Sequence, residues 1–197
     1  MPALTTMKLK AEELERLTHL LSSEKGSDYD MLGYAINLET GKIRDLLSEE
    51  NSSDDGVLQI LTILLSHYSA SNPVPRTEIL IKFRNLPGGY AYERAFHDRA
   101  VQPILQFFGD DPTELVASAR LLKGEPLSYG DVSVEIPTLE GIPLVYILWA
   151  RNEFPASATL LYDESACHYL PTEDLAILAE LTTNRLLKAR LTLKKKE

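Results

Sequence analysis

The segment IPLVYILWARNEFPASATLLYD, residues 142–163, decides the fold. Its two apolar stretches, residues 143–149 and 156–162, flank a short connection and predict an antiparallel hairpin. The first stretch is largely apolar at both alternating sets of positions, so we expect it to be a central strand that is covered on both faces. Trp149 and Phe154 should then anchor the hairpin in the core.

The remaining sequence adds one strand to this hairpin and surrounds it with helices. The segment DVSVEIP, residues 131–137, completes a C-terminal three-stranded meander, and GYAINLETGKIRDLL, residues 33–47, predicts a second hairpin. Apolar residues at helical spacing predict helices over about 8–23, 56–69, 90–108, 112–122 and 172–191. The expected fold class is α+β, an antiparallel sheet covered by about five helices.

Length and charge limit the organisation and the partners. The 197 residues, of which 44% are hydrophobic, suit a single α+β domain over residues 1–197. Residues 1–27 and 185–197 are expected to be helical or flexible extensions, and the second of these is basic. The net charge of −9 argues against nucleic acid as a partner, because an acidic surface repels phosphate backbones.

The composition also indicates where the protein works. Cys167 is the only cysteine, which excludes an internal disulfide and any four-cysteine zinc or iron–sulfur site built by this chain. The longest apolar segment, residues 57–65, is too short to span a bilayer. We therefore expect a cytoplasmic protein without a membrane segment. Common nucleotide, metalloprotease and hydrolase motifs are missing, so no cofactor and no metal is expected.

The end of the meander holds the first group of candidate site residues. Glu153, Asp163, Cys167 and His168 follow strand ends, and such residue types bind divalent metals or form Cys–His nucleophiles. In an antiparallel hairpin, however, Glu153 lies at the turn and Asp163 at the far end of the returning strand. At ~3.3 Å per residue they would be about 25–30 Å apart. Turn and cap chemistry is the competing interpretation.

The segment KFRNLPGGYAYERAFHDR, residues 82–99, holds the second group. Gly88 and Gly89 enter a predicted helix, where free backbone N–H groups can bind an anion, and Arg84, Arg94 and Arg99 would add positive charge. We therefore predict a binding site for a small anionic ligand. A tight turn that needs glycine is the alternative.

His67 is the third candidate. It ends the predicted helix 56–69, whose apolar residues cover nearly all faces. A histidine in this place is typical of a helix C-terminus, where its charge complements the dipole, although a role in a ligand pocket is the alternative.

Four segments, LLSHY, FRNLPGGYAYERAF, PLVYILWARNEFPASATLLYD and YLPTEDLAIL, occur in this order. Together they resemble the uncharacterised prokaryotic family known as domain of unknown function 3786, over residues 28–180. The resemblance implies a link to anaerobic corrinoid or iron–sulfur metabolism, because some family members carry an added iron–sulfur domain. It implies no activity. The connection from Ala150 to Glu153 is less acidic than the family pattern, which disfavours a metal there.

We therefore interpret the chain as a non-catalytic accessory domain that binds a small molecule or a protein partner. A metal-dependent enzyme using Glu153, Asp163 or His168 is one alternative. A homodimeric scaffold joined through the terminal helices is another.

Overall fold

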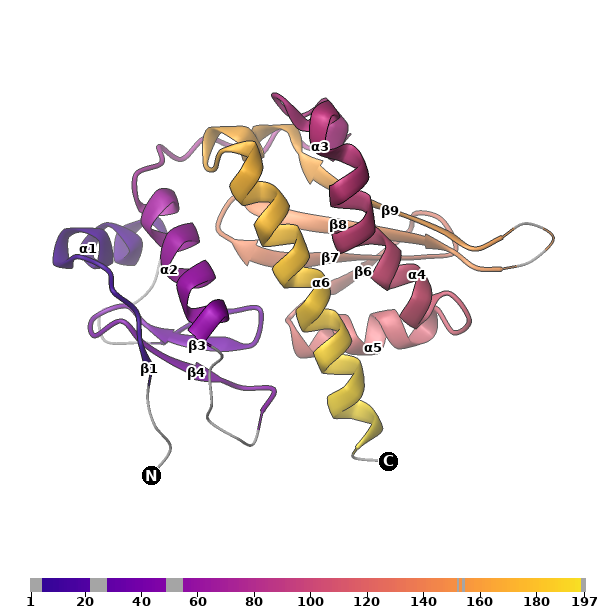
Figure 1. Ribbon diagram of the computed structural model, residues 1–197, viewed down its shortest axis with the longest axis horizontal. Coiled ribbons are helices and arrows are strands. Elements are labelled where there is room, and N and C mark those ends of the chain that lie inside the picture. The colour runs from indigo at the N-terminus through magenta and orange to yellow at the C-terminus, as the bar shows by residue number, and fades with distance from the viewer. Residues whose placement is uncertain (1–4, 22–27, 49–54, 152, 154, 196–197) are drawn as a thin grey trace.

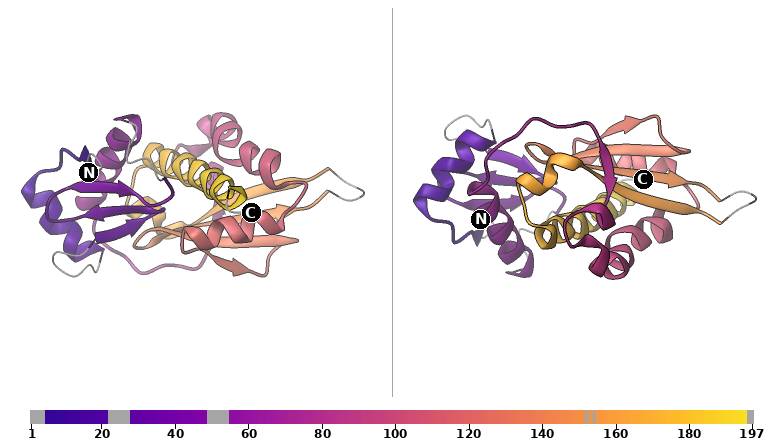
Figure 2. Two further views of the ribbon diagram at one scale, coloured as in Figure 1. Left: turned by 90° about the horizontal axis from the view of Figure 1, so that it is seen from below. Right: turned by 90° about the horizontal axis from the view of Figure 1, so that it is seen from above.

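The computed structural model describes residues 5–21, 28–48, 55–151, 153 and 155–195. Its strands form two antiparallel sheets, and the long helix α6 (Thr172–Lys194) packs between the elements of residues 5–69 and the other helices (Figures 1 and 2). The described strands are β1 (Thr5–Thr6), β2 (Asp28–Met31), β3 (Tyr34–Asn37), β4 (Lys42–Asp45), β5 (Leu80–Lys82), β6 (Glu125–Leu127), β7 (Val132–Leu139), β8 (Ile142–Trp149) and β9 (Ser157–Asp163). The described α-helices are α1 (Ala11–Leu20), α2 (Asp55–Ser69), α3 (Gly89–Phe96), α4 (Gln102–Phe108), α5 (Thr113–Leu121) and α6 (Thr172–Lys194).

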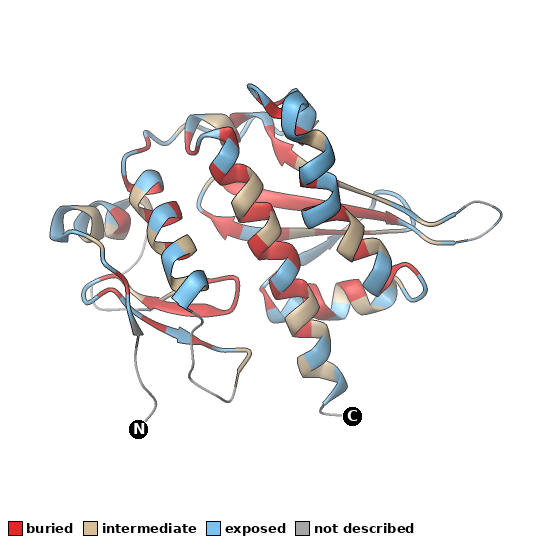
Figure 3. Ribbon diagram, in the orientation of Figure 1, coloured by how far each residue is buried: buried red, intermediate tan, exposed pale blue. Residues whose placement is uncertain are grey.

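The predicted C-terminal hairpin and meander are confirmed. The larger sheet has the order β5-β9-β8-β7-β6, and β8 pairs with β9 from Leu144↔Tyr162 to Trp149↔Ser157. Seven of the eight residues of β8 are buried, so this central strand is buried on both faces, as its apolar sequence predicts. The α+β class is confirmed, since helices cover the sheet (Figure 3).

The prediction that Trp149 anchors the core is wrong. Its side chain is 40% exposed at the end of β8, where the hairpin extends beyond the helices. The reason is the position of Trp149 along the strand. Val145 and Ile147 point to the same face of β8 and are buried, whereas Trp149 lies beyond the part of β8 that other elements cover. Phe154, the second expected anchor, lies outside the described residues.

The smaller sheet is built around the predicted hairpin of residues 33–47. Its order is β1-β4-β3-β2, and β3 pairs antiparallel to β4 across Gly41, which has φ of +68°. The turn from β2 to β3 places Leu32 and Gly33 at positive φ (55° and 73°). Helices α1 and α2 pack against each other beside this sheet. The Tyr29 hydroxyl donates a hydrogen bond to the Thr138 carbonyl in β7 and so joins the two sheets.

The helix expected over residues 90–108 contains a π-helical segment, η2 (His97–Val101), between α3 and α4. Pro103 explains the interruption, because proline has no N–H to donate to the carbonyl of Arg99 and its ring crowds that carbonyl. A wider turn relieves the clash. Helix α6 stabilises this π-helical turn, because the Thr183 hydroxyl donates a hydrogen bond to the Ala100 carbonyl at 2.7 Å.

Helix α6 contacts most of the other helices of the fold. It packs against α2, α3, α4 and α5, and its buried residues follow helical spacing from Leu175 to Ala189. The basic residues from Arg185 onward, placed in an extension by sequence, continue this helix, and Arg185 itself is only 2% exposed. Within the described residues, no helix is both long and apolar enough to cross a membrane.

Candidate functional site

Asp163, the last residue of β9, is fully buried and holds several chain segments together. One carboxylate oxygen accepts hydrogen bonds from the N–H and hydroxyl of Thr77 (both 3.0 Å) and of Ser165 (2.9 and 2.6 Å). The other accepts the Glu78 N–H at 2.7 Å. Burial by itself would raise the pKa of Asp163, but the bonds from Ser165 and Thr77 outweigh it and hold that pKa well below its ordinary value.

The structure does not bring the other carboxylate and histidine candidates to Asp163. Glu153 is exposed in the β8–β9 connection, before the first residue of β9, whereas Asp163 is the last of the seven residues of that strand, which is about 20 Å long. His168 is exposed in the short helix η3 (Glu164–His168), and the Cys167 thiol donates to the Glu164 carbonyl. Among the described residues, no three His, Cys, Asp or Glu side chains lie together so as to hold a metal ion.

His67 forms a link between two helices. Its Nδ1 lies 2.5 Å from Oδ2 of Asp174, a buried residue in the first turn of α6, while the imidazole itself is half exposed. The contact joins the C-terminal end of α2 to the N-terminal end of α6. The carboxylate partner gives His67 a structural role at the edge of the core.

Each of the two positions of the Pro-Gly-Gly turn requires glycine for a different steric reason. Gly88 caps α3 with φ of +76° and has open space around it. A Cβ on Gly89 would lie 2.0 Å from the carbonyl oxygen of Phe83, so only glycine fits there. The Thr172 hydroxyl also donates to the carbonyl of Pro87 and ties this turn to α6. These contacts account for the turn without a ligand.

The three candidate arginines do not converge on that turn. Arg84 pairs with Glu93 of α3 at 3.5 Å and lies over the ring of Tyr90. Arg99 reaches the opposite side of the α3–α4 helix and pairs with Glu180 of α6 at 4.0 Å. Arg94 is exposed in the last turn of α3. The structure therefore divides the five residues of the predicted anion site between different surfaces.

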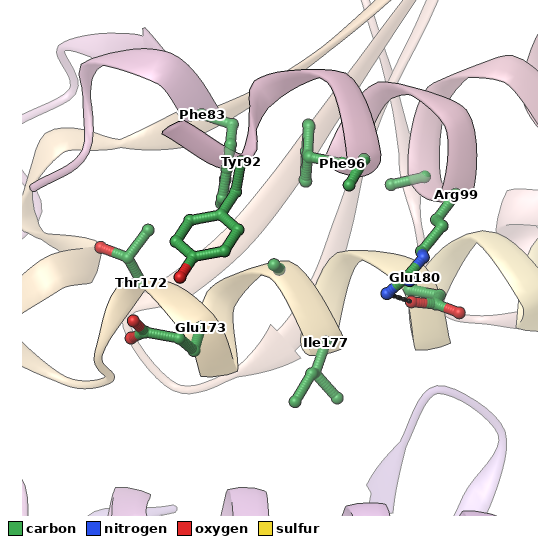
Figure 4. A pocket seen from close by; sticks show the side chains of 11 residues that line it. Phe83, Tyr92, Phe96, Arg99, Thr172, Glu173, Ile177 and Glu180 are labelled. Carbon is green, nitrogen blue, oxygen red and sulfur yellow. Dashed lines mark ion pairs between the residues drawn. The ribbon is translucent and has the colours of Figure 1, made fainter. Parts of the chain in front are cut away.

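One cavity, the α3–α6 slot, lies between α3 with η2 and α6, and has a volume of about 190 Å³. Phe83 and Phe96 form an aromatic wall, with ring centroids 4.1 Å apart. Figure 4 shows Tyr92 and Glu173 toward one end of the slot and the Arg99–Glu180 pair at the other.

A larger cavity, the α2–α6 cleft, has a volume of about 390 Å³ and lies between α2, the N-terminal sheet and α6. Four apolar side chains line its walls: Val57, Ile60, Ile177 and Leu181. Four ionic side chains also line it: Asp45 from β4, and Glu180, Arg185 and Lys188 from α6.

Arg185 is held rigidly in this cleft. Its guanidinium makes two bonds to the Asp45 carboxylate (2.9 and 2.7 Å) and two to the carbonyls of Leu32 and Gly33 (2.8 and 3.0 Å). It also lies 3.9 Å from the centroid of the Tyr34 ring. The contacts fix the β2–β3 turn and β4 onto α6.

Lys188 adds a second cation to the same carboxylate. Its Nζ lies 2.7 Å from Asp45 Oδ2, and its side chain is 41% exposed. Burial would raise the pKa of Asp45, but the bonds from Arg185 and Lys188 outweigh it and lower the pKa. Two cations therefore share one ionised carboxylate, so the group of Asp45, Arg185 and Lys188 carries one net positive charge. Glu180, the other acidic residue of the lining, lies 4.0 Å from Arg99.

A family model for a domain of unknown function, DUF3786, matches residues 12–185. The chain belongs to the DUF3786 family. This match confirms the family suggested by the four sequence segments. No curated protein and no solved structure matches the chain.

Sequence reasoning missed the ionic group of this DUF3786 domain because Arg185 was counted with the basic extension. A signal for it was present. Arg185 follows Thr182 by three residues and precedes Ala189 by four, and both of these residues are buried. A cation on the apolar face of a helix requires a buried partner. The partner, Asp45, lies 140 residues earlier, so no local pattern identifies it.

Proposed function

We propose that this DUF3786 domain is a non-catalytic binding domain, and that its ligand is a small molecule with an anionic group and an apolar body. The proposed site is the α2–α6 cleft. The observation that carries the proposal is the sharing of one carboxylate, Asp45, by two cations, Arg185 and Lys188, in a cavity of about 390 Å³.

The positive group is preorganised for an anion. Arg185 is fixed by four hydrogen bonds and the Tyr34 ring, so it loses no conformational freedom when a ligand binds. Lys188 is half exposed and can turn its ammonium toward a ligand while Arg185 continues to neutralise Asp45. A carboxylate or phosphate would thus meet an ammonium whose partner Asp45 is already neutralised by Arg185, while Glu180, the other carboxylate of the lining, lies 4.0 Å from Arg99.

The walls of the cleft select the rest of the ligand. Val57 and Ile60 of α2 face Ile177 and Leu181 of α6 across the cavity. Burying an apolar body between them is favourable by ~25 cal/mol per Å² of apolar surface. Free inorganic phosphate would make only the ionic contact, so an amphipathic anion is the better match.

The ionic group suits binding better than proton transfer. Asp45 has a lowered pKa because two cations stabilise its charged form, and a carboxylate with a low pKa is a weak general base at neutral pH. The side chains that line the cleft include no serine, cysteine or histidine. This supports a binding role for the cleft.

The experiment compares octanoate with octanol in a thermal unfolding series. Octanoate should raise the melting temperature of the protein, and octanol should do so less, because it lacks the charge. At ~100 times the dissociation constant, a ligand adds ~2.7 kcal/mol to the free energy of unfolding. Lys188→Met keeps the aliphatic stem and should remove the difference between octanoate and octanol.

Lys42→Met is the matched control, because Lys42 is exposed on β4, outside the cleft. It should respond to octanoate as the unmodified protein does. An equal response of Lys188→Met and the unmodified protein would refute the site. So would a melting temperature that octanoate leaves unchanged.

The cytoplasmic location and the accessory role beside corrinoid or iron–sulfur proteins belong to the same proposal. Their support is the family resemblance and the single cysteine. The metal-dependent enzyme and the homodimer stay predictions from sequence, and metal analysis and sedimentation of the purified protein would test them.

A further inference from the structure

The α3–α6 slot has a different chemistry from the α2–α6 cleft. Its aromatic wall, Phe83 and Phe96, is accompanied by small side chains that leave space open, among them Ala95 and Ala176. The volume of about 190 Å³ is about half that of the cleft. The slot can therefore hold only a small molecule.

The π-helix η2 forms part of the slot. Arg99 and Ala100, which line the cavity, both belong to this segment. Single π-turns inside α-helices occur frequently at functional sites, since they displace the wall of a helix without ending it. Here the displacement is stabilised by the hydrogen bond from Thr183 to Ala100, so the slot is a fixed feature of the fold.

The charged side chains at the slot are mainly acidic. Glu173 and Glu180 come from one side of α6, and Arg99 is the cation that faces them. Arg99 approaches Glu180 only to 4.0 Å, and both side chains are largely exposed (68% and 42%), so this ion pair is weak. Glu173 has the Tyr92 hydroxyl near it in the same cavity (Figure 4).

We propose that the α3–α6 slot binds a small organic amine. The ammonium group would pair with the Glu173 carboxylate, and the aliphatic chain would lie against the aromatic wall. The apolar wall favours the aliphatic chain and the carboxylate favours the ammonium, so the two parts of the slot select the two parts of one ligand. This site lies between α3 and α6 and the proposed anion site between α2 and α6, and Ile177 and Glu180 line both cavities. Its ligand has the opposite charge.

The test measures the binding of n-pentylamine by isothermal titration calorimetry, with n-pentanol as the neutral probe. Pentylamine should bind the full chain and pentanol should bind more weakly. Glu173→Gln removes the charge and should weaken the binding of pentylamine about tenfold, the usual size of a lost charge-assisted hydrogen bond. Ala176→Phe should abolish binding, because the new ring fills the slot.

Three controls separate this site from non-specific attraction to an acidic protein. Glu125→Gln removes an exposed carboxylate on β6, and Ala117→Phe adds a ring to an exposed position of α5. Both should bind pentylamine like the unmodified protein, as should Lys188→Met in the other cavity. If Ala176→Phe fails to fold, Ala95→Phe on the exposed wall of α3 replaces it.

Two results would overturn the proposal. One is the absence of a measurable affinity for pentylamine in the unmodified protein. The other is unchanged affinity for pentylamine in a folded variant whose slot is filled by the added ring. Because this substitution changes no charge, unchanged affinity would show that pentylamine does not bind in the slot.

Discussion

Replacing Asp163 by asparagine should destabilise the protein by about 3–4 kcal/mol. The carboxylate has no exposed surface and accepts five hydrogen bonds, from groups of Thr77, Glu78 and Ser165. Asparagine can keep its oxygen toward Thr77 and Ser165, but its amide N–H groups then face the Glu78 N–H. Losing a bond to a charged acceptor costs about 1.5–3 kcal/mol, and an orphaned buried donor adds about 1–3 kcal/mol.

Urea unfolding followed by circular dichroism measures this loss, with Asp110→Asn at an exposed carboxylate as the matched control. The same comparison has a pH dependence of known sign. The pKa of Asp163 is lowered by folding, so its stabilisation is complete above the ordinary pKa of about 3.9 and is lost as pH falls further. The difference between the unmodified protein and Asp163→Asn should therefore shrink as pH is lowered from about 6 to about 2.5.

A loss below about 1 kcal/mol at neutral pH would refute this account of Asp163. A difference that stays constant down to acid pH would refute its electrostatic part, because an uncharged packing effect does not titrate. Asp110→Asn should leave both the stability and its pH profile unchanged.

Trp149→Ala should destabilise the protein by only about 1–2 kcal/mol, less than the 3–5 kcal/mol of a buried tryptophan, because the indole is 40% exposed. Acrylamide should quench the fluorescence of this single tryptophan efficiently, and a shielded indole or a loss above about 3 kcal/mol would contradict the observed exposure. Gly89→Ala should cost about 3 kcal/mol and Gly88→Ala only about 1 kcal/mol, because a Cβ at Gly89 meets the Phe83 carbonyl whereas Gly88 needs only its positive φ. Urea unfolding of the two variants checks this order, and equal losses would show that the chain near Phe83 can move aside.

The parts of the fold that sequence predicts are those with a strong local pattern. The β8–β9 hairpin follows from two largely apolar stretches, and the hairpin around Gly41 follows from a polar loop between apolar runs. The strands that the sequence did not predict are β1, β2, β5 and β6. These have two to four residues each, which is too short to establish alternation.

The candidate site is harder to predict from the sequence because the residues that contact one another in it are far apart along the chain. Asp45 and Arg185 meet only where α6 packs against the smaller sheet. The Pro-Gly-Gly segment was interpreted as functional because its sequence resembles an anion-binding turn. In the fold, however, both positions require glycine for steric reasons. Neither the Asp45–Arg185 contact nor the requirement for glycine can be read from the spacing of residues in the sequence, because both depend on which atoms of distant segments lie next to the residue.

The junction between Arg185 and the N-terminal sheet also has a consequence for protein synthesis. The guanidinium binds the carbonyls of Leu32 and Gly33 and the carboxylate of Asp45, which lies 140 residues earlier. Ribosomes add about 5–20 residues per second, so Asp45 is made about 7–28 s before its partner. During that interval the Asp45 carboxylate and the carbonyls of Leu32 and Gly33 lack the guanidinium that they bind in the finished fold. Substitutions that weaken α6 should therefore reduce the yield of folded protein in cells more than the stability of the molecules that finish folding.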